Sequence, residues 1–245
     1  MPESEHTLVI VPTYNEISNL ASILQRIRAA VPDADILVVD DASPDGTGAL
    51  ADQLAAADPA IGVLHREGKD GLGRAYLAGF AHALAHGYTY VVEIDADGSH
   101  DPAELPRMLE LARDADLVLG SRWVRGGAVR NWPWLRQAIS RTANAYSRLM
   151  LRSRIRDITA GFRVFRADAL QSLELDAVSS QGYCFQIELA WRLERAGGTI
   201  VEHPITFVER ENGRSKMHLG IVAEALLRVT VWGMTGTPSS KTAKV

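Results

Sequence analysis

The chain has 245 residues, of which 47% are hydrophobic and 23% are charged, and its formal net charge is −4. This composition and length suit one large α/β domain that buries its core without metal or disulfide staples. Cys184 is the only cysteine in the sequence, which excludes an intrachain disulfide and favours a reducing compartment.

The first 120 residues alternate apolar runs with helical patterns. Leu20, Ile23 and Ile27 recur at helical spacing, and Asp101 with Pro102 begins a helix predicted to reach about residue 113. The alternation predicts a doubly wound, mostly parallel α/β sheet with ligands at the carboxyl ends of its strands. Mostly continuous apolar runs, typical of buried parallel strands, predict strands at residues 8–12, 36–40, 61–65, 88–95 and 116–120.

Two glycines, Gly71 and Gly73, precede another helical pattern. They suggest a dinucleotide-binding loop, but the third glycine of that motif is missing and the loop is not the first strand–helix turn. We interpret the segment as a loop that opens a helix.

The second half of the chain is less regular. A basic helix is predicted at residues 135–151, with Ile139, Tyr146 and Leu149 on one side. The apolar stretch 219–234 contains Glu224 and Arg228 and is shorter than the ~20 apolar residues that a membrane span needs. We expect one domain over residues 1–235, with two halves that meet near residue 120, and a disordered tail at 236–245. The other predicted elements are strands at 162–166 and 199–209 and helices near 186–196 and 218–232.

Residues 117–156 contain nine arginines and no aspartate or glutamate. Trp123, Trp132, Trp134 and Tyr146 are interleaved with these arginines. The stretch indicates an anionic partner. Considered by itself, it is compatible with nucleic acid and equally with a phosphorylated lipid at an anionic membrane surface. A merely solvated helix face is less favoured, because such faces normally include acidic residues.

Asp95 and Asp97 stand two residues apart where a predicted buried strand ends. On an extended segment, side chains at this spacing share a face and can both coordinate one hard cation such as Mg²⁺ or Mn²⁺. A lone Asp-x-Asp is weak evidence, because a helix-capping turn produces the same pattern. The motifs elsewhere in the chain decide between these interpretations.

Eight motifs occur in one order along the chain: VPTYNE, VVDDASPDGT, GKDGLGRAY, DADGSH, GSRWVRGG, NWPW, DITAGFRVF and RENGRSKM. In this combination the chain resembles the polyprenol-phosphate (dolichol-phosphate) mannose synthases, a group of inverting GT-A glycosyltransferases, from about residue 7 to residue 233. The resemblance implies a GT-A fold with basic amphipathic helices on the acceptor side.

The resemblance also implies roles for residues that match the motifs. Asp95 and Asp97 would bind the metal on the donor diphosphate, with the backbone of Ala96 nearby, whereas Ser99 stands where some relatives carry a glutamine ligand. Arg210 and Lys216 would belong to a loop that closes over the diphosphate. The pocket for the base and ribose of GDP would be formed by Pro12, Tyr14, Glu16, Val39 and Asp41.

On the acceptor side, Arg122, Arg136 and Ser140 would receive the acceptor phosphate and, with Asp97, carry catalysis. Arg136 and Ser140 are four residues apart, so they share a helix face. The implied reaction transfers mannose from GDP-mannose to a polyprenyl phosphate, with Mg²⁺ or Mn²⁺ as cofactor and no nucleic acid as partner. We expect a peripheral location on the cytoplasmic face of a membrane. A separate membrane-anchoring protein stays open as a further partner.

Three alternatives stay open at this stage. The first keeps the lipid acceptor and changes the sugar, giving a polyprenyl-phosphate glucosyltransferase. The second is a haloacid-dehalogenase-type phosphatase, suggested by the sequence Asp-Ala-Asp-Gly-Ser at 95–99. That nucleophile motif would be expected after the first strand of its domain, however, and several strands precede it here. The third is a catalytically silent lipid- or nucleotide-binding module, which the intact carboxylates and loop cations disfavour.

Overall fold

The computed structural model describes residues 5–178, 180, 182–209 and 219–236. Arg210, Lys216, the first residue of the helix predicted at 218–232 and the tail from 237 onward lie outside the described residues. The elements in chain order are β1 (Thr7–Thr13), α1 (Leu20–Ala30), β2 (Asp35–Asp40), α2 (Thr47–Ala57), β3 (Ile61–His65), α3 (Leu72–Ala85), β4 (Tyr90–Glu93), the 3₁₀ helix η1 (Pro102–Glu104), α4 (Leu105–Ala112), β5 (Leu117–Ser121), β6 (Ala128–Arg130), α5 (Trp134–Leu151), β7 (Arg163–Arg166), α6 (Ala167–Gln171), the 3₁₀ helix η2 (Leu175–Ala177), α7 (Gly182–Arg195), β8 (Ile200–Pro204), β9 (Thr206–Val208) and α8 (Leu219–Thr235).

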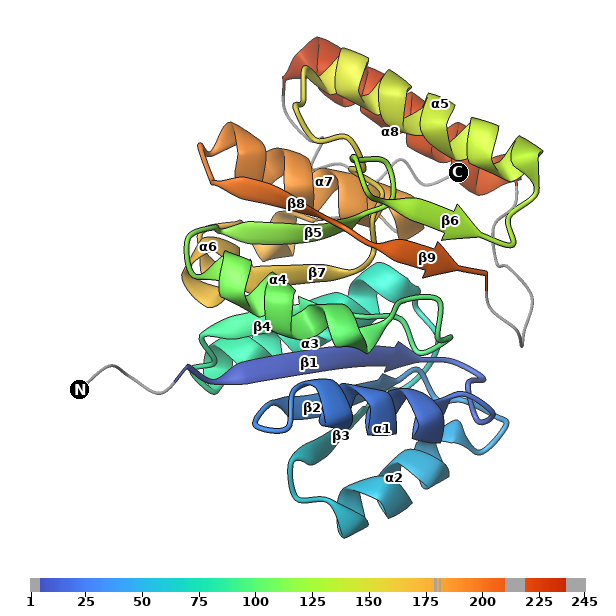
Figure 1. The fold of residues 1–245 in the computed structure, drawn as a ribbon, viewed down its shortest axis with the longest axis vertical. Helices are drawn as coiled ribbons and strands as arrows, with labels where there is room; N and C mark the ends of the chain where they lie inside the picture. The colour runs from blue at the N-terminus through green and yellow to red at the C-terminus, as the bar shows by residue number, and fades with distance from the viewer. Residues whose placement is uncertain (1–4, 179, 181, 210–218, 237–245) are drawn as a thin grey trace.

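Seven of the described strands form one central sheet in the order β3-β2-β1-β4-β7-β5-β8 (Figure 1). Strand β7 runs antiparallel to both of its neighbours, β4 and β5, and the other neighbours in the sheet pair in parallel. Strands β6 and β9 form a separate parallel pair. The predicted doubly wound, mostly parallel sheet is therefore confirmed.

Alternating side chains of β1 supply the two halves of the core, one on each face of the sheet. Val9 and Val11 pack with buried residues of α1 and α4, whereas Leu8 and Ile10 pack with buried residues of α3 and α7. Both faces of a mostly parallel sheet are thus covered by helices, which explains why its strands read as continuous apolar runs.

Helix α3 lies unusually close to β1, and glycine makes this possible. A Cβ atom at Gly79 would stand 2.8 Å from two carbon atoms of the Ile10 side chain. Gly71, with φ of +90°, precedes the first residue of the helix in a conformation that favours glycine. The segment predicted to be a loop that opens a helix does so.

Helices α5 and α8 lie side by side at one end of the molecule (Figure 1). The Tyr146 hydroxyl contacts Thr230 Oγ1 at 2.5 Å, and a Cβ at Gly233 would approach the Met150 carbonyl oxygen to 2.5 Å. Of the apolar residues predicted to share one side of α5, Tyr146 is half-buried against α8, whereas Leu149 is 77% exposed. The helix instead buries Asn144, Ser147 and Leu151.

Several predicted boundaries differ from the structure. The strand predicted at 199–209 is two strands, because the chain leaves the central sheet after Pro204 and pairs with β6 from Thr206. The strand predicted at 88–95 is limited to Tyr90–Glu93, and the helix predicted at 101–113 begins with a 3₁₀ turn. Within the described part of the chain, no helix combines the length and the apolar character needed to cross a bilayer.

Candidate active site

The loops after β1 and β2 are joined to each other through the buried side chain of Asp40. This carboxylate accepts hydrogen bonds from Thr13 Oγ1 at 2.8 Å and from Ser43 Oγ at 2.6 Å. Asn15 and Ala42 adopt left-handed backbone conformations, with φ of +59° and +53°. Such conformations are uncommon for residues other than glycine and occur often at functional sites, so the two loops are held in one specific shape.

The residues predicted to hold the nucleoside meet at these loops. Pro12 and Val39 are buried register partners on β1 and β2. Tyr14 and Glu16 are partly exposed beyond the end of β1. Asp41, which is 5% exposed, follows β2. The structure thus gathers all five predicted residues at the carboxyl edge of the sheet, and their role in binding the nucleoside stays a prediction.

Two cations that sequence reasoning did not select also contact the residues of these loops. Arg66 donates a hydrogen bond from Nη1 to Asp41 Oδ1, and Lys69 Nζ lies 4.2 Å from the centre of the Tyr14 ring. Both residues belong to the loop between β3 and α3. The GKDG part of the motif at 68–76 was a signal for Lys69, whereas the pairing of Arg66 with Asp41 depends on the sheet.

Asp95 and Asp97 follow β4 at the same edge. Tyr76 donates a hydrogen bond to Asp95 Oδ1 at 3.4 Å, and Asp97 Oδ1 accepts one from the Ser99 backbone N–H at 3.0 Å. Asp97 lies in a turn that continues through Gly98, with φ of +74°, and not on the extended segment that was expected to carry both carboxylates on one face. The two carboxylates are nevertheless both placed where a parallel α/β sheet binds its ligands.

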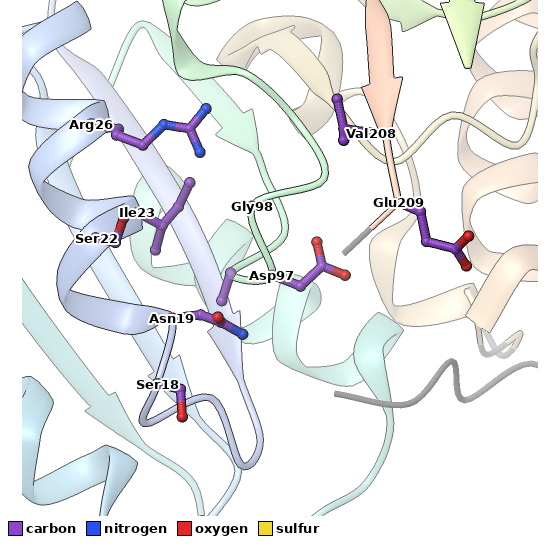
Figure 2. Close-up of a pocket in the computed structure, with 10 residues that line it drawn as sticks. Ser18, Asn19, Ser22, Ile23, Arg26, Asp97, Gly98, Val208 and Glu209 are labelled. Carbon is purple, nitrogen blue, oxygen red and sulfur yellow. The ribbon is translucent and has the colours of Figure 1, made fainter. Parts of the chain in front are cut away.

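Beside Asp97 is a polar cavity of about 290 Å³. Figure 2 shows Ser22 and Arg26 of α1 on one side of it, Asp97 in the middle, and Glu209 on the far side. The cavity is lined by Ser18, Asn19, Ser22, Ile23, Arg26, Ala96, Asp97, Gly98, Val208 and Glu209. Two carboxylates at the end of β4 and this polar space suit a hard divalent cation that keeps water and takes further oxygen ligands from a diphosphate.

Arg122, predicted to bind the acceptor phosphate, is held in a buried ion pair. Its Nε and Nη2 atoms donate to the two carboxylate oxygens of Asp157 at 2.7 Å and 2.6 Å, a bidentate geometry. The guanidinium carbon also lies 5.6 Å from the ring centres of Trp132 and Phe207. Asp157 is fully buried, so the position of Arg122 is fixed by the protein before any ligand binds.

Ser140 and Arg122 are connected through two further side chains. Thr159 Oγ1 accepts hydrogen bonds from Arg122 Nη2 at 3.0 Å and from Asn144 Nδ2 at 3.1 Å. Asn144 Nδ2 also donates to the Ser140 carbonyl oxygen at 3.0 Å. Asn144 and Thr159, which sequence reasoning did not select, therefore link Arg122, which follows β5, to the backbone of Ser140 on α5.

Arg136, the third predicted acceptor residue, forms an ion pair with Glu209. Its guanidinium carbon lies 4.1 Å from the centre of the Trp132 ring. Glu209 also lines the cavity beside Asp97, so Arg136 is separated from that cavity by one carboxylate. Sequence reasoning missed Glu209, although it directly precedes the RENGRSKM motif.

Buried titratable groups lie beneath the site. Burial lowers the pKa of His100 to about 4, so this imidazole, packed between Phe162 and Phe207, is neutral at neutral pH. Burial also raises the pKa of Glu93 to about 7, even though Arg163 Nε lies 3.6 Å from its Oε2. Arg163 donates to the Ala160 carbonyl oxygen at 2.7 Å and thereby fixes the loop that carries Asp157.

Comparison with known proteins adds independent evidence. Residues 8–174 match the sequence model of the glycosyl transferase family 2. The chain is 58% identical, over 93% of both chains, to a Micrococcus luteus protein named undecaprenyl-phosphate mannosyltransferase. It is 56% identical to the polyprenol monophosphomannose synthase of Mycolicibacterium smegmatis, over 95% of this chain and 89% of that protein.

A solved structure shares the fold at lower sequence identity. A Pyrobaculum calidifontis mannosyltransferase in complex with GDP-Man and Mn²⁺ superposes with a TM-score of 0.63 and 20% identity, over 94% of this chain and 64% of that one. At this identity the likeness concerns the arrangement of helices and strands alone. It agrees with the GT-A-like sheet described above.

Proposed function

The chain belongs to glycosyl transferase family 2, and from this premise we propose that it transfers mannose from GDP-mannose to a polyprenyl phosphate with inversion. One observation carries the proposal beyond family membership. In the order of the sheet, Asp95 and Asp97 after β4 lie between the loops after β1 and β2 on one side and, on the other, Arg122 after β5 and the basic residues of α5. A nucleotide sugar and an anionic acceptor would therefore meet at these carboxylates.

The names of the relatives support the identity of both substrates. The two relatives that are 58% and 56% identical to this chain are named undecaprenyl-phosphate mannosyltransferase and polyprenol monophosphomannose synthase. The structural relative from Pyrobaculum holds GDP-Man and Mn²⁺. The names of the two sequence relatives do not favour the polyprenyl-phosphate glucosyltransferase or the phosphatase alternative.

The acceptor needs little help from a general base. Its phosphate monoester has a second pKa of about 6 and is mostly dianionic at neutral pH. One of its oxygens attacks the anomeric carbon while the bond from that carbon to the diphosphate breaks, and GDP leaves with the electron pair. Because the displacement is direct, it inverts the anomeric configuration, and we assign no protein base.

The residues of the site then act by position and charge. Asp95 and Asp97 would hold Mg²⁺ or Mn²⁺, which when bound neutralises charge on the departing diphosphate. Arg122 and Arg136 would hold the acceptor phosphate, with Ser140 as a further donor. The Asp157 pair keeps the Arg122 guanidinium in a fixed place, which reduces the reorganisation needed when the phosphate binds. Arg210 and Lys216 remain predicted contacts of the diphosphate.

The central test is a transfer assay with a panel of nucleotide sugars. The purified protein is incubated with radiolabelled GDP-mannose, GDP-glucose or UDP-glucose, a prenyl phosphate, and Mn²⁺ or Mg²⁺. We expect label in the lipid fraction from GDP-mannose, at a rate at least tenfold above the other donors. Equal or faster transfer of glucose would replace the mannosyl assignment with the glucosyl alternative.

We also propose that α5 and α8 rest on a membrane surface. Trp134 is 78% exposed, Leu149 is 77% exposed, and on α8 Leu227 and Met234 are 66% and 79% exposed. Exposed arginines at 148, 152 and 154 lie near the end of α5. Apolar side chains beside cations are the composition of a helix that lies in an anionic lipid interface. The cytoplasmic face is the location that fits a nucleotide-sugar donor.

Changing Arg148, Arg152 and Arg154 together to glutamine is expected to weaken binding to anionic liposomes at low salt. Each surface arginine contributes about 1 kcal/mol near an anionic leaflet, so the loss corresponds to roughly a hundredfold in the partition coefficient. Sedimentation with liposomes measures it. The matched control changes Arg107, Arg113 and Arg166, which removes the same charge from other faces and should leave sedimentation unchanged. Equal sedimentation of both triple variants would refute the docking role.

A further inference from the structure

The ion pair between Arg136 and Glu209 has an unusual position. Glu209 follows β9, and its backbone N–H donates to the Arg130 carbonyl oxygen at 3.2 Å, which anchors the residue at the rim of the cleft. The two paired side chains are 18% and 32% exposed, so neither is fully solvated. Figure 2 shows the Glu209 carboxylate directed away from Asp97, although both residues line one cavity. The Glu209 carboxylate thus pairs with Arg136, the arginine that would bind the acceptor phosphate in the proposed reaction.

The surroundings of Arg136 keep it ready for another anion. The Trp132 ring supports the guanidinium from one side at 4.1 Å. The Nε atom is buried and has no hydrogen-bond partner among the described residues, whereas Nη1 donates to Glu209. A tetrahedral phosphate accepts from several N–H groups of a guanidinium at once, which the single contact with Glu209 does not achieve.

We propose that Glu209 occupies the place of the acceptor phosphate on Arg136, yields it when the acceptor binds, and takes it back when the product leaves. This inference rests on the proposed function, because it assigns Arg136 to the acceptor phosphate. Glu209 is accordingly a positioning residue that acts through Arg136. Glu209 neutralises Arg136 when no lipid is bound, and it competes with the phosphate of the acceptor and of the product for this arginine.

The charges of the two lipids give this competition a direction. The acceptor is a phosphate monoester that carries close to two negative charges at neutral pH, and it competes with a single carboxylate charge. The product is a phosphodiester with one negative charge, which is no more than the charge of Glu209. The acceptor therefore displaces Glu209 more readily than the product does, and the return of Glu209 to Arg136 favours product release.

An intramolecular competitor leaves a quantitative signature. Any ligand that must displace Glu209 from Arg136 loses affinity by the same factor, whatever its own strength of binding. A partly exposed ion pair of this kind corresponds to a factor of roughly two to five. A residue that merely supports the local structure would not change two ligands by one common factor that depends on Arg136.

The test uses Glu209→Gln, which keeps the shape of the side chain and removes its charge. Dissociation constants are measured by calorimetry, without nucleotide sugar, for geranyl phosphate and for its mannosyl phosphodiester. We expect both constants to fall by the same factor, roughly two- to fivefold. In an Arg136→Ala background, Glu209→Gln should change neither constant. In steady-state assays the variant should show a lower KM for the acceptor, no rise in kcat, and stronger inhibition by product.

Glu110→Gln is the matched control, because Glu110 pairs with Arg107 on the exposed face of α4. It should leave both dissociation constants unchanged. The proposal would be overturned if Glu209→Gln bound both lipids with wild-type dissociation constants. It would also be overturned if Glu209→Gln changed these constants in the Arg136→Ala background. A larger dissociation constant for Mn²⁺ in Glu209→Gln would also overturn it, because Glu209 would then be a ligand of the metal. A wild-type protein that neither binds geranyl phosphate nor transfers mannose would instead overturn the proposed function itself.

Discussion

Replacing Asp97 with alanine is expected to reduce mannosyl transfer by about a thousandfold or more. A metal that neutralises the leaving group contributes several kcal/mol to the reaction, and each 1.36 kcal/mol is about a tenfold change in rate. Asp97 is one of the two carboxylates after β4 and lines the cavity between α1 and β9. Transfer is measured with GDP-mannose and a prenyl phosphate at saturating Mn²⁺, and Mn²⁺ affinity is measured separately by calorimetry.

Two further variants separate charge from local structure. Asp97→Asn keeps an oxygen that accepts from the Ser99 backbone N–H, a bond of 3.0 Å in the structure, but it lacks the charge. It should therefore be nearly as inactive as Asp97→Ala while it retains the turn. Asp33→Ala makes the same substitution in the exposed connection between α1 and β2 and should leave the rate unchanged. Full turnover by Asp97→Ala, or by the wild type in excess EDTA, would contradict the metal-dependent reaction.

Replacing Asp157 with asparagine is expected to lower the free energy of unfolding by about 3–5 kcal/mol, the usual cost of breaking a buried ion pair. Asp157 is fully buried and accepts hydrogen bonds from the backbone N–H, Nε and Nη2 of Arg122. An asparagine presents an N–H group toward one of these donors and leaves the arginine charge uncompensated. Urea denaturation measures the change.

The exposed pair of Arg166 with Asp168 provides the control. Their side chains are 38% and 65% exposed, so Asp168→Asn should cost at most about 1 kcal/mol. Removing both charges from the buried pair, as Arg122→Met with Asp157→Leu, should recover part of the stability lost in Asp157→Asn, because no unpaired buried charge remains. A double variant that is less stable than Asp157→Asn would show that the pair itself, and not the orphaned charge, stabilises this region.

The sequence alone predicted most of the strands of the central sheet and the two carboxylates, Asp95 and Asp97, of the candidate site. The strand at Ile61–His65 was predicted at its observed bounds, because a continuous apolar run between turn residues is a local signal. The carboxylates Asp95 and Asp97 were predicted from their place after a buried strand and from the accompanying motifs. The predicted family was confirmed by the match over residues 8–174 and by the named relatives.

Only the tertiary structure decided what surrounds these residues. Arg122 pairs with Asp157 across 35 positions, and Arg136 pairs with Glu209 across 73 positions. No local periodicity encodes such partners, because they are set by strand order and by the antiparallel insertion of β7 between β4 and β5. The same holds for the break near residue 205, where the chain leaves the central sheet to pair with β6. Local patterns specify which elements form and which side chains they carry, whereas the partner of each buried charge is determined by how those elements pack.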